Sequence, residues 1–209
     1  MSSRYTRRGY EEYRKIAEYI ARMSWQKKGN YMVFFPSYKL MDDVWQVYQE
    51  EFSSGWVRCI CQHASMTERE REEFLEEFTE ESADTLVGFC VMGGIFSEGI
   101  DLTQDRLIGA MIVGTGIPQV CNEREILKQY FGVEGFDYAY LYPGMNKVLQ
   151  SAGRVIRTEK DKGVILLMDE RFQSPHYRRM FPREWSDCRR CTMENVTELL
   201  TEFWKKDPT

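Results

Sequence analysis

The sequence predicts an α/β protein in which a mostly parallel sheet carries helices on both faces. Short apolar runs alternate along the chain with longer segments whose apolar residues recur at helical spacing, and this alternation is typical of parallel sheets. Polar or glycine-rich turns follow three of the runs, at residues 36–38, 93–101 and 114–118. Because such sheets bind ligands at the carboxyl ends of their strands, we expect a functional site at that edge.

The first predicted helix covers residues 10–23 and should end at residues 27–29, where two lysines precede a glycine. Residues 31–35 form a continuous apolar run, which predicts a buried strand. The polar turn after this strand leads into a second helix, whose apolar face should extend to Tyr48.

Residues 57–61 predict the second strand and residues 85–91 the third. Between them, Thr67 and Glu70 have the spacing of a capping box, which predicts a helix through Phe78. This helix and the segment after it carry eight glutamates, a pattern typical of a solvated face, although an acidic docking surface is an alternative.

Residues 107–113 predict a fourth strand, residues 123–131 and 146–157 two helices, and residues 163–168 a fifth strand. We interpret residues 1–209 as a single domain with its core at about 10–172, because 43% hydrophobic residues in this length can fill one core. Residues 173–209 form a basic and aromatic tail.

The composition excludes several classes of protein. No stretch reaches the roughly 18 apolar residues of a membrane helix, and the N-terminal residues lack the apolar core of a secretion signal. We therefore expect a cytoplasmic protein without a membrane partner. A net charge of −5 argues against indiscriminate nucleic-acid binding but allows a local track along one strand.

The six scattered cysteines indicate reduced, mostly buried thiols. Cys188 and Cys191 have the spacing of half a zinc site, but a second half is missing and neither histidine lies at ligand spacing. We expect no metal in this chain, with a small metalloprotein organised by this pair as an alternative.

One predicted helix carries a pattern suited to polyphosphate. Gln150, Gly153, Arg154 and Arg157 would share one face of a helix over residues 146–157. That face would present an amide, a gap at the glycine and two guanidiniums, whose planar forks of donors match phosphate oxygens. The alternative is a surface helix with two ordinary arginines.

A second pattern follows the third strand. Gly93 and Gly94 permit backbone angles or close approaches that other residues resist. Ser97, Glu98 and Asp101 then place a hydroxyl and two carboxylates beside that backbone. The alternative is a structural turn whose acids cap the next element.

Together these segments resemble motifs V and VI of superfamily 2 helicases, in the form found in the DinG/XPD branch. Ser97-Glu98-Gly99-Ile100-Asp101 matches motif V, and Gln150-x-x-Gly153-Arg154-x-x-Arg157 matches motif VI. Residues 33–38 also resemble the strand-to-turn segment that opens this domain. The resemblance extends from about residue 10 to residue 172.

The resemblance implies a RecA-like helicase motor domain, the second and C-terminal one of two. ATP with magnesium would bind in the cleft between the two domains, and single-stranded DNA would cross both. The implied residues fall into three groups: arginine fingers at Arg154 and Arg157; ATP-binding residues at Gln150, Gly153, Glu98, Gly99 and Asp101; and DNA-binding residues at Ser37, Tyr38 and Ser97.

No P-loop is present in the sequence. Gly94-x₄-Gly99 and Gly109-x₄-Gly114 have the glycine spacing, but neither is followed by the lysine that cradles phosphates. Asp169-Glu170 imitates a magnesium-binding box, and we interpret it as a structural strand end. The resemblance assigns the P-loop, the magnesium box and an iron–sulfur cluster to the first motor domain, which we expect on the same polypeptide; this chain alone should be inactive.

Three alternatives remain at this point. The domain could belong to an RNA helicase or a double-strand translocase, or it could be a non-catalytic α/β nucleic-acid-binding module. The tail adds a further choice, because its six arginines between residues 171 and 190 are interleaved with aromatic residues. This composition suits either a single-strand platform or an amphipathic helix that docks onto its own domain.

Overall fold

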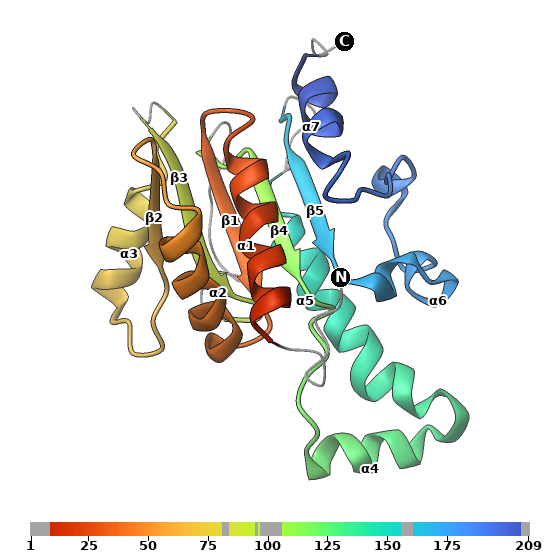
Figure 1. The fold of residues 1–209 in the computed structure, drawn as a ribbon. Helices are drawn as coiled ribbons and strands as arrows, with labels where there is room; N and C mark the ends of the chain where they lie inside the picture. The colour runs from red at the N-terminus through yellow and green to blue at the C-terminus, as the bar shows by residue number, and fades with distance from the viewer. Residues whose placement is uncertain (1–8, 81–83, 95, 97–105, 156–160, 206–209) are drawn as a thin grey trace.

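The computed structural model describes residues 9–80, 84–94, 96, 106–155 and 161–205. Five strands form one sheet in the order β2-β3-β1-β4-β5, and every neighbouring pair is parallel (Figure 1). This confirms the predicted α/β fold. The strands are β1 (Asn30–Phe35), β2 (Val57–Cys61), β3 (Thr85–Val91), β4 (Gly109–Val113) and β5 (Val164–Met168).

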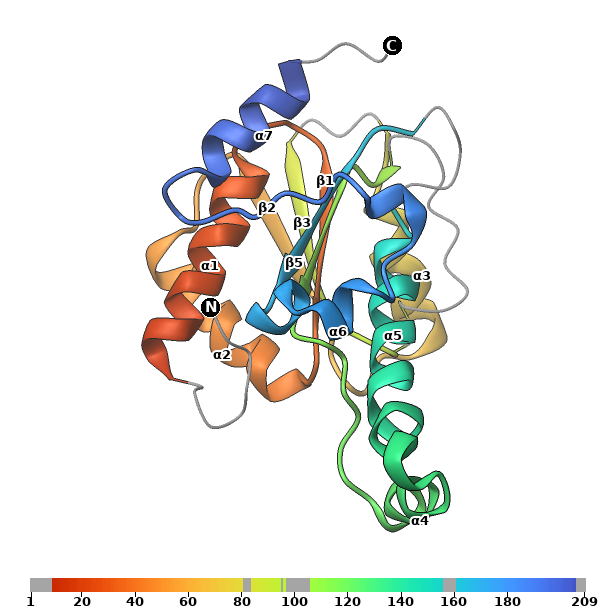
Figure 2. The same cartoon turned by 90° about the vertical axis from the view of Figure 1, so that its right-hand side faces the viewer.

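Helices cover both faces of the sheet (Figure 2). One face carries α1 (Tyr10–Ser24), α2 (Tyr38–Glu51) and α7 (Val196–Lys205), and the other carries α3 (Glu68–Glu76) and α5 (Tyr142–Ala152). Every residue of β1 is buried, with alternate side chains directed into two separate core clusters. A strand that is covered on both faces must be apolar throughout, which explains the continuous run in the sequence.

Local chemistry fixes the starts of two helices. Ser37 precedes α2, and its hydroxyl accepts a hydrogen bond from the Leu40 N–H at 3.4 Å. Thr67 and Glu70 form the predicted capping box at the start of α3, where the Thr67 N–H donates to Glu70 Oε2 at 2.6 Å. Each cap satisfies N–H groups that a helix start leaves without partners.

The first helix ends earlier than predicted, at Ser24. The chain then turns toward β1 through Gly29, which adopts a φ of 151°. A Cβ at this position would lie 2.4 Å from the Ile108 side chain, so only glycine fits the approach to the neighbouring chain. The contact that redirects the chain thus comes from a residue 79 positions away, which the local pattern does not reveal.

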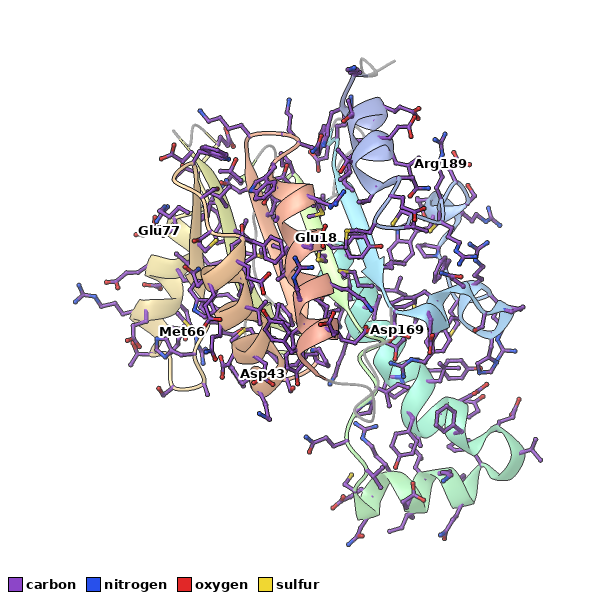
Figure 3. All side chains as sticks on the ribbon, viewed as in Figure 1. Glu18, Asp43, Met66, Glu77, Asp169 and Arg189 are labelled. Atoms are coloured by element: carbon purple, nitrogen blue, oxygen red, sulfur yellow. The ribbon has the colours of Figure 1, made fainter. Side chains whose placement is uncertain are left out.

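A helical hairpin at residues 120–141 projects from the body between β4 and α5 (Figure 1). It contains α4 (Asn122–Tyr130), close to the predicted helix, and a 3₁₀ turn at Gly132–Glu134. A π-helical segment, Asp137–Leu141, leads directly into α5. No residue of α4 is buried, and Figure 3 shows its side chains standing out from the ribbon.

The tail folds back onto the domain rather than forming one amphipathic helix. It contains a 3₁₀ turn (Glu170–Gln173), the short helix α6 (Pro175–Arg178) and α7. Phe172 and Tyr177 are buried in one core cluster, and Val196 in the other. The aromatic residues of the tail therefore pack against the sheet and its helices, as the docking interpretation expects. No helix in the described ranges has the length and apolar character needed to cross a membrane.

Candidate functional site

The connections that follow the neighbouring strands β1 and β3 run to opposite sides of the sheet. The chain passes from β1 over β3 to the edge strand β2, and from β3 over β1 in the other direction to β4. In open parallel sheets, the crevice at such a reversal is where ligands bind, outside the carboxyl ends of the strands. The turns at this crevice contain Ser37 and Tyr38 after β1, and Gly93 and Gly94 after β3.

Tyr38 is half-buried at the first position of α2, with its ring packed against a core cluster. Its hydroxyl accepts a hydrogen bond from Gln62 Nε2 at 2.8 Å. Burial raises the pKa of this hydroxyl, so it stays protonated at neutral pH. The side chain is therefore neither free at the surface nor fully enclosed, and one part of it remains open to a ligand.

Gln62 is a site residue that the sequence did not suggest. Its side chain is almost completely buried, and its Oε1 accepts a hydrogen bond from the Val91 N–H at 2.8 Å. The same amide donates to Tyr38, so Gln62 ties the end of β3 to the start of α2. A lone polar residue after an apolar strand was the only signal in the sequence, and it does not identify the two partners.

Two glycine turns lie on either side of the β1 end, after β3 and after β4. Gly93 has a φ of 68° and Gly116 a φ of 64°, a backbone region that favours glycine. A Cβ on Gly93 would lie 2.9 Å from Lys147 Cε, and a Cβ on Gly116 would lie 2.6 Å from the Gly144 carbonyl oxygen. Helix α5 thus packs directly on both turns, near its own N-terminal end.

The other end of α5 carries the predicted ATP-binding group. Gln150 is exposed on the last turn, and the helix ends at Ala152 with Gly153 as its C-cap. The Gly153 N–H donates to the Leu149 carbonyl at 2.9 Å, and Arg154 lies half-buried in the turn that follows. The prediction of one continuous helix through residue 157 is wrong, because the chain leaves the helix at Gly153.

Val155 explains this early end. It is buried, and a Cβ on Gly163 would lie 2.2 Å from its Cγ1. Gly163 immediately precedes β5, and the Val164 N–H donates to the Ile108 carbonyl just before β4. The chain must therefore turn here to place Val155 at the amino ends of these strands, and packing overrides the helical pattern.

The candidate residues are consequently divided between two edges of the sheet. Ser37 and Tyr38 lie at the carboxyl edge, whereas Arg154 lies toward the amino edge beside Val155. Strands of five to seven residues separate the two edges by roughly 15–25 Å at about 3.3 Å per residue. Ser97, Glu98, Gly99, Asp101 and Arg157 lie outside the described residues.

Asp169 has the structural role that the sequence suggested. Its side chain is buried at the end of β5 (Figure 3), and Oδ1 accepts hydrogen bonds from the Arg171 N–H at 2.9 Å and from Arg171 Nε at 2.7 Å. A second guanidinium nitrogen contacts Oδ2 at 3.0 Å. This carboxylate caps the 3₁₀ turn of the tail and is neutralised by an arginine two residues later.

The expectation of mostly buried thiols is wrong in part: Cys90 is buried and Cys59, Cys61 and Cys191 are partly buried, but Cys121 and Cys188 are exposed. Burial raises the pKa of Cys59 to about 11 and that of Cys61 to about 12, and it also raises the pKa of Cys191. Protonated thiols are poor metal ligands, because the thiolate is the form that binds. Within the described ranges, no three His, Cys, Asp or Glu residues group in a way that could hold a metal ion.

Comparison with known proteins identifies relatives of this arrangement. Residues 20–188 match the helicase C-terminal domain family. The chain is 27% identical to the ATP-dependent DNA helicase XPD of Sulfolobus acidocaldarius over 86% of its own length and 32% of the relative. It is 31% identical to the regulator of telomere elongation helicase 1 homolog of Culex quinquefasciatus, over 70% of this chain and 17% of that protein.

Solved structures agree on the fold. An XPD helicase structure superimposes with a TM-score of 0.69 at 23% identity, covering 86% of this chain and 32% of the other. The C-terminal domain of the DEAD-box protein Dbp5 gives a TM-score of 0.51 at 12% identity, covering 93% of this chain and 92% of the other. The five parallel strands are thus those of a RecA-like fold, and the chain spans a third or less of these curated helicases. This chain belongs to the helicase C-terminal domain family, and it is similar to the C-terminal domain of XPD-type helicases.

Proposed function

We propose that this chain is the second motor domain of an ATP-dependent DNA helicase. It acts with a first motor domain that supplies the P-loop, the magnesium-binding residues and an iron–sulfur cluster. The observation that carries the proposal is the course of α5, which runs from the glycine turns at the carboxyl edge to Arg154 near the amino edge. One rigid helix therefore connects a surface suited to nucleic acid with a group suited to nucleotide phosphates.

The nucleotide end consists of Gln150 and Gly153, followed by Arg154 and, outside the described residues, Arg157. Gln150 is exposed, so its side chain can contact a phosphate or orient a water molecule in the cleft between the two domains. A guanidinium at the start of a turn can approach the γ-phosphate from a second domain and stabilise charge in the transition state. By the resemblance to motif V, Glu98, Gly99 and Asp101 would also contact the nucleotide; they lie outside the described residues, so they are not placed at either end of α5.

The nucleic-acid end consists of Ser37 and Tyr38, together with Ser97 from motif V. Ser37 opens α2, where N–H groups and the helix dipole favour a phosphate. Tyr38 offers the part of its ring that the core leaves open, and aromatic rings bind single-stranded bases by stacking. One relative is the ATP-dependent DNA helicase XPD, which supports DNA as the strand.

Replacement of Tyr38 tests this assignment. We expect Tyr38→Ala to weaken the binding of a labelled oligo(dT) by about 1–3 kcal/mol, as measured by fluorescence anisotropy, because one base loses its stacking partner. Trp56→Ala is the matched control, since Trp56 is 66% exposed and immediately precedes β2, at the amino edge of the sheet. Equal affinities of the wild type and Tyr38→Ala would remove Tyr38 from the DNA track, and preference for oligo(U) would favour an RNA helicase instead.

A further inference from the structure

Lys147 lies between the two glycine turns that flank the end of β1. A Cβ on Gly93 would lie 2.9 Å from its Cε and 3.3 Å from its Nζ, and a Cβ on Gly116 would lie 3.4 Å from its Cβ. These turns follow β3 and β4, the two neighbours of β1 in the sheet. The lysine stem therefore extends from α5 across one turn to the other, along the carboxyl edge.

The Gly93 turn also adjoins the Tyr38 contact. A Cβ on Gly94 would lie 3.3 Å from Gln62 Nε2, the atom that donates to the Tyr38 hydroxyl. The two glycines leave this stretch of backbone without side-chain cover, so a ligand can come close to it. On one side of the turn lies a half-buried ring, and on the other lies an ammonium group.

The ammonium group of Lys147 has no carboxylate partner among the described residues. Three other lysines are paired on their own helices, Lys15 with Glu12, Lys39 with Asp43 and Lys128 with Glu125, and Lys27 lies over the ring of Trp204. An ammonium offers three donors and no acceptor, so the natural partner of Lys147 is an anion from outside the domain.

We propose that Lys147 binds a backbone phosphate of single-stranded DNA beside Tyr38. The proposal rests on the proposed function, and it adds a phosphate contact that lies outside the helicase motifs. The position favours the strand over the nucleotide, because Lys147 lies five residues before the end of α5 at Ala152, or about 7.5 Å along the helix axis toward the carboxyl edge. A cation and a ring on either side of one glycine turn would hold a phosphate and a base of the same strand.

Salt dependence provides the test. Binding of labelled oligo(dT) to the whole chain is measured by anisotropy between about 50 and 200 mM salt, a range over which lost phosphate contacts are resolved. For single strands, each phosphate contact makes the slope of log K against log salt concentration more negative by about 0.7. Relative to 1 M salt, one such contact raises the affinity at 50 mM salt by about eightfold. Lys147→Gln should therefore have a slope less negative by about 0.7 and bind about eightfold more weakly at 50 mM salt, whereas Lys147→Arg should keep the wild-type slope. Lys15→Gln on α1 is the control and should match the wild type.

The outcomes separate this inference from the proposed function. If Lys147→Gln keeps the wild-type slope while Tyr38→Ala weakens binding, the lysine site is wrong and the DNA track stands. If the wild-type chain does not bind oligo(dT), both are wrong. If Lys147→Gln weakens the binding of a fluorescent ATP analogue but not that of oligo(dT), Lys147 contacts the nucleotide and the inference is overturned. Thermal melting confirms that each variant is folded, which is expected because Lys147 ends at the surface.

Discussion

The two ends of α5 differ in what holds them in place. At the carboxyl edge, the helix packs on two glycine turns, and Gln62 fixes the turn after β3 to the start of α2. At the other end, the helix ends at Ala152 with Gly153 as its C-cap, and the buried Val155 packs the following turn against Gly163. We therefore expect the proposed DNA contact and the proposed nucleotide contact to be separable by mutation, although they lie at the two ends of one helix.

The largest effect is expected from Arg154→Ala in a protein that joins this domain to a first motor domain. DNA-stimulated ATP hydrolysis should fall by about two to five decades, because charge stabilisation in the transition state is lost. The rate is measured at saturating oligo(dT), with Arg69→Ala as the control, since Arg69 is exposed on α3 and pairs only with Glu73. A wild-type rate for Arg154→Ala would contradict the assignment of the arginine finger.

A matched pair of glycine substitutions tests the two ends separately. Gly116→Ala would strain a positive φ and meet the Gly144 carbonyl oxygen, and Gly163→Ala would meet Val155 and the Ile108 carbonyl oxygen. Both should lower the free energy of unfolding by about 1–3 kcal/mol, as judged by urea titration. Only Gly116→Ala should also weaken oligo(dT) binding, because it displaces the carboxyl edge.

The control for this pair is Gly55→Ala, at a position where an added Cβ meets nothing within 4 Å. Its free energy of unfolding and its oligo(dT) affinity should both match the wild type. Equal loss of DNA affinity in Gly116→Ala and Gly163→Ala would show that the two ends of α5 are not independent.

The smallest effect is expected at the tip of the α4 hairpin. Tyr130 is 82% exposed and Val133 is fully exposed, so Tyr130→Ser and Val133→Ser should change the free energy of unfolding by less than about 0.5 kcal/mol. Phe34→Ala, in a strand buried on both faces, should cost about 3–5 kcal/mol by contrast. A large loss for the tip variants would mean that the hairpin helps to position the start of α5.

The sequence predicted those parts of the fold that local chemistry determines. The five strands follow from apolar runs with turns after them, and the starts of α2 and α3 follow from the caps at Ser37 and Thr67. The ends of α1 and α5 were missed, because they depend on Ile108 and Gly163, which approach from other parts of the chain.

The motifs named the candidate residues, and their roles remain predictions. The structure adds where the described ones lie: Ser37 and Tyr38 at one edge of the sheet, and Gln150 and Arg154 toward the other, a division that follows from the course of α5. Gln62 and Lys147 were missed, since their contacts join residues more than 20 positions apart. A pattern along the chain cannot reveal such contacts unless the sheet order is known.

We propose that DNA binds at the carboxyl edge of the sheet and does not contact the far end of α5. The most direct test compares the oligo(dT) affinity of this chain as wild type, Tyr38→Ala and Arg154→Ala, in one anisotropy series at low salt. We predict that Tyr38→Ala weakens binding by about 1–3 kcal/mol and that Arg154→Ala retains the wild-type affinity. If Arg154→Ala loses as much affinity as Tyr38→Ala, or if only Arg154→Ala loses affinity, then DNA does not bind as proposed.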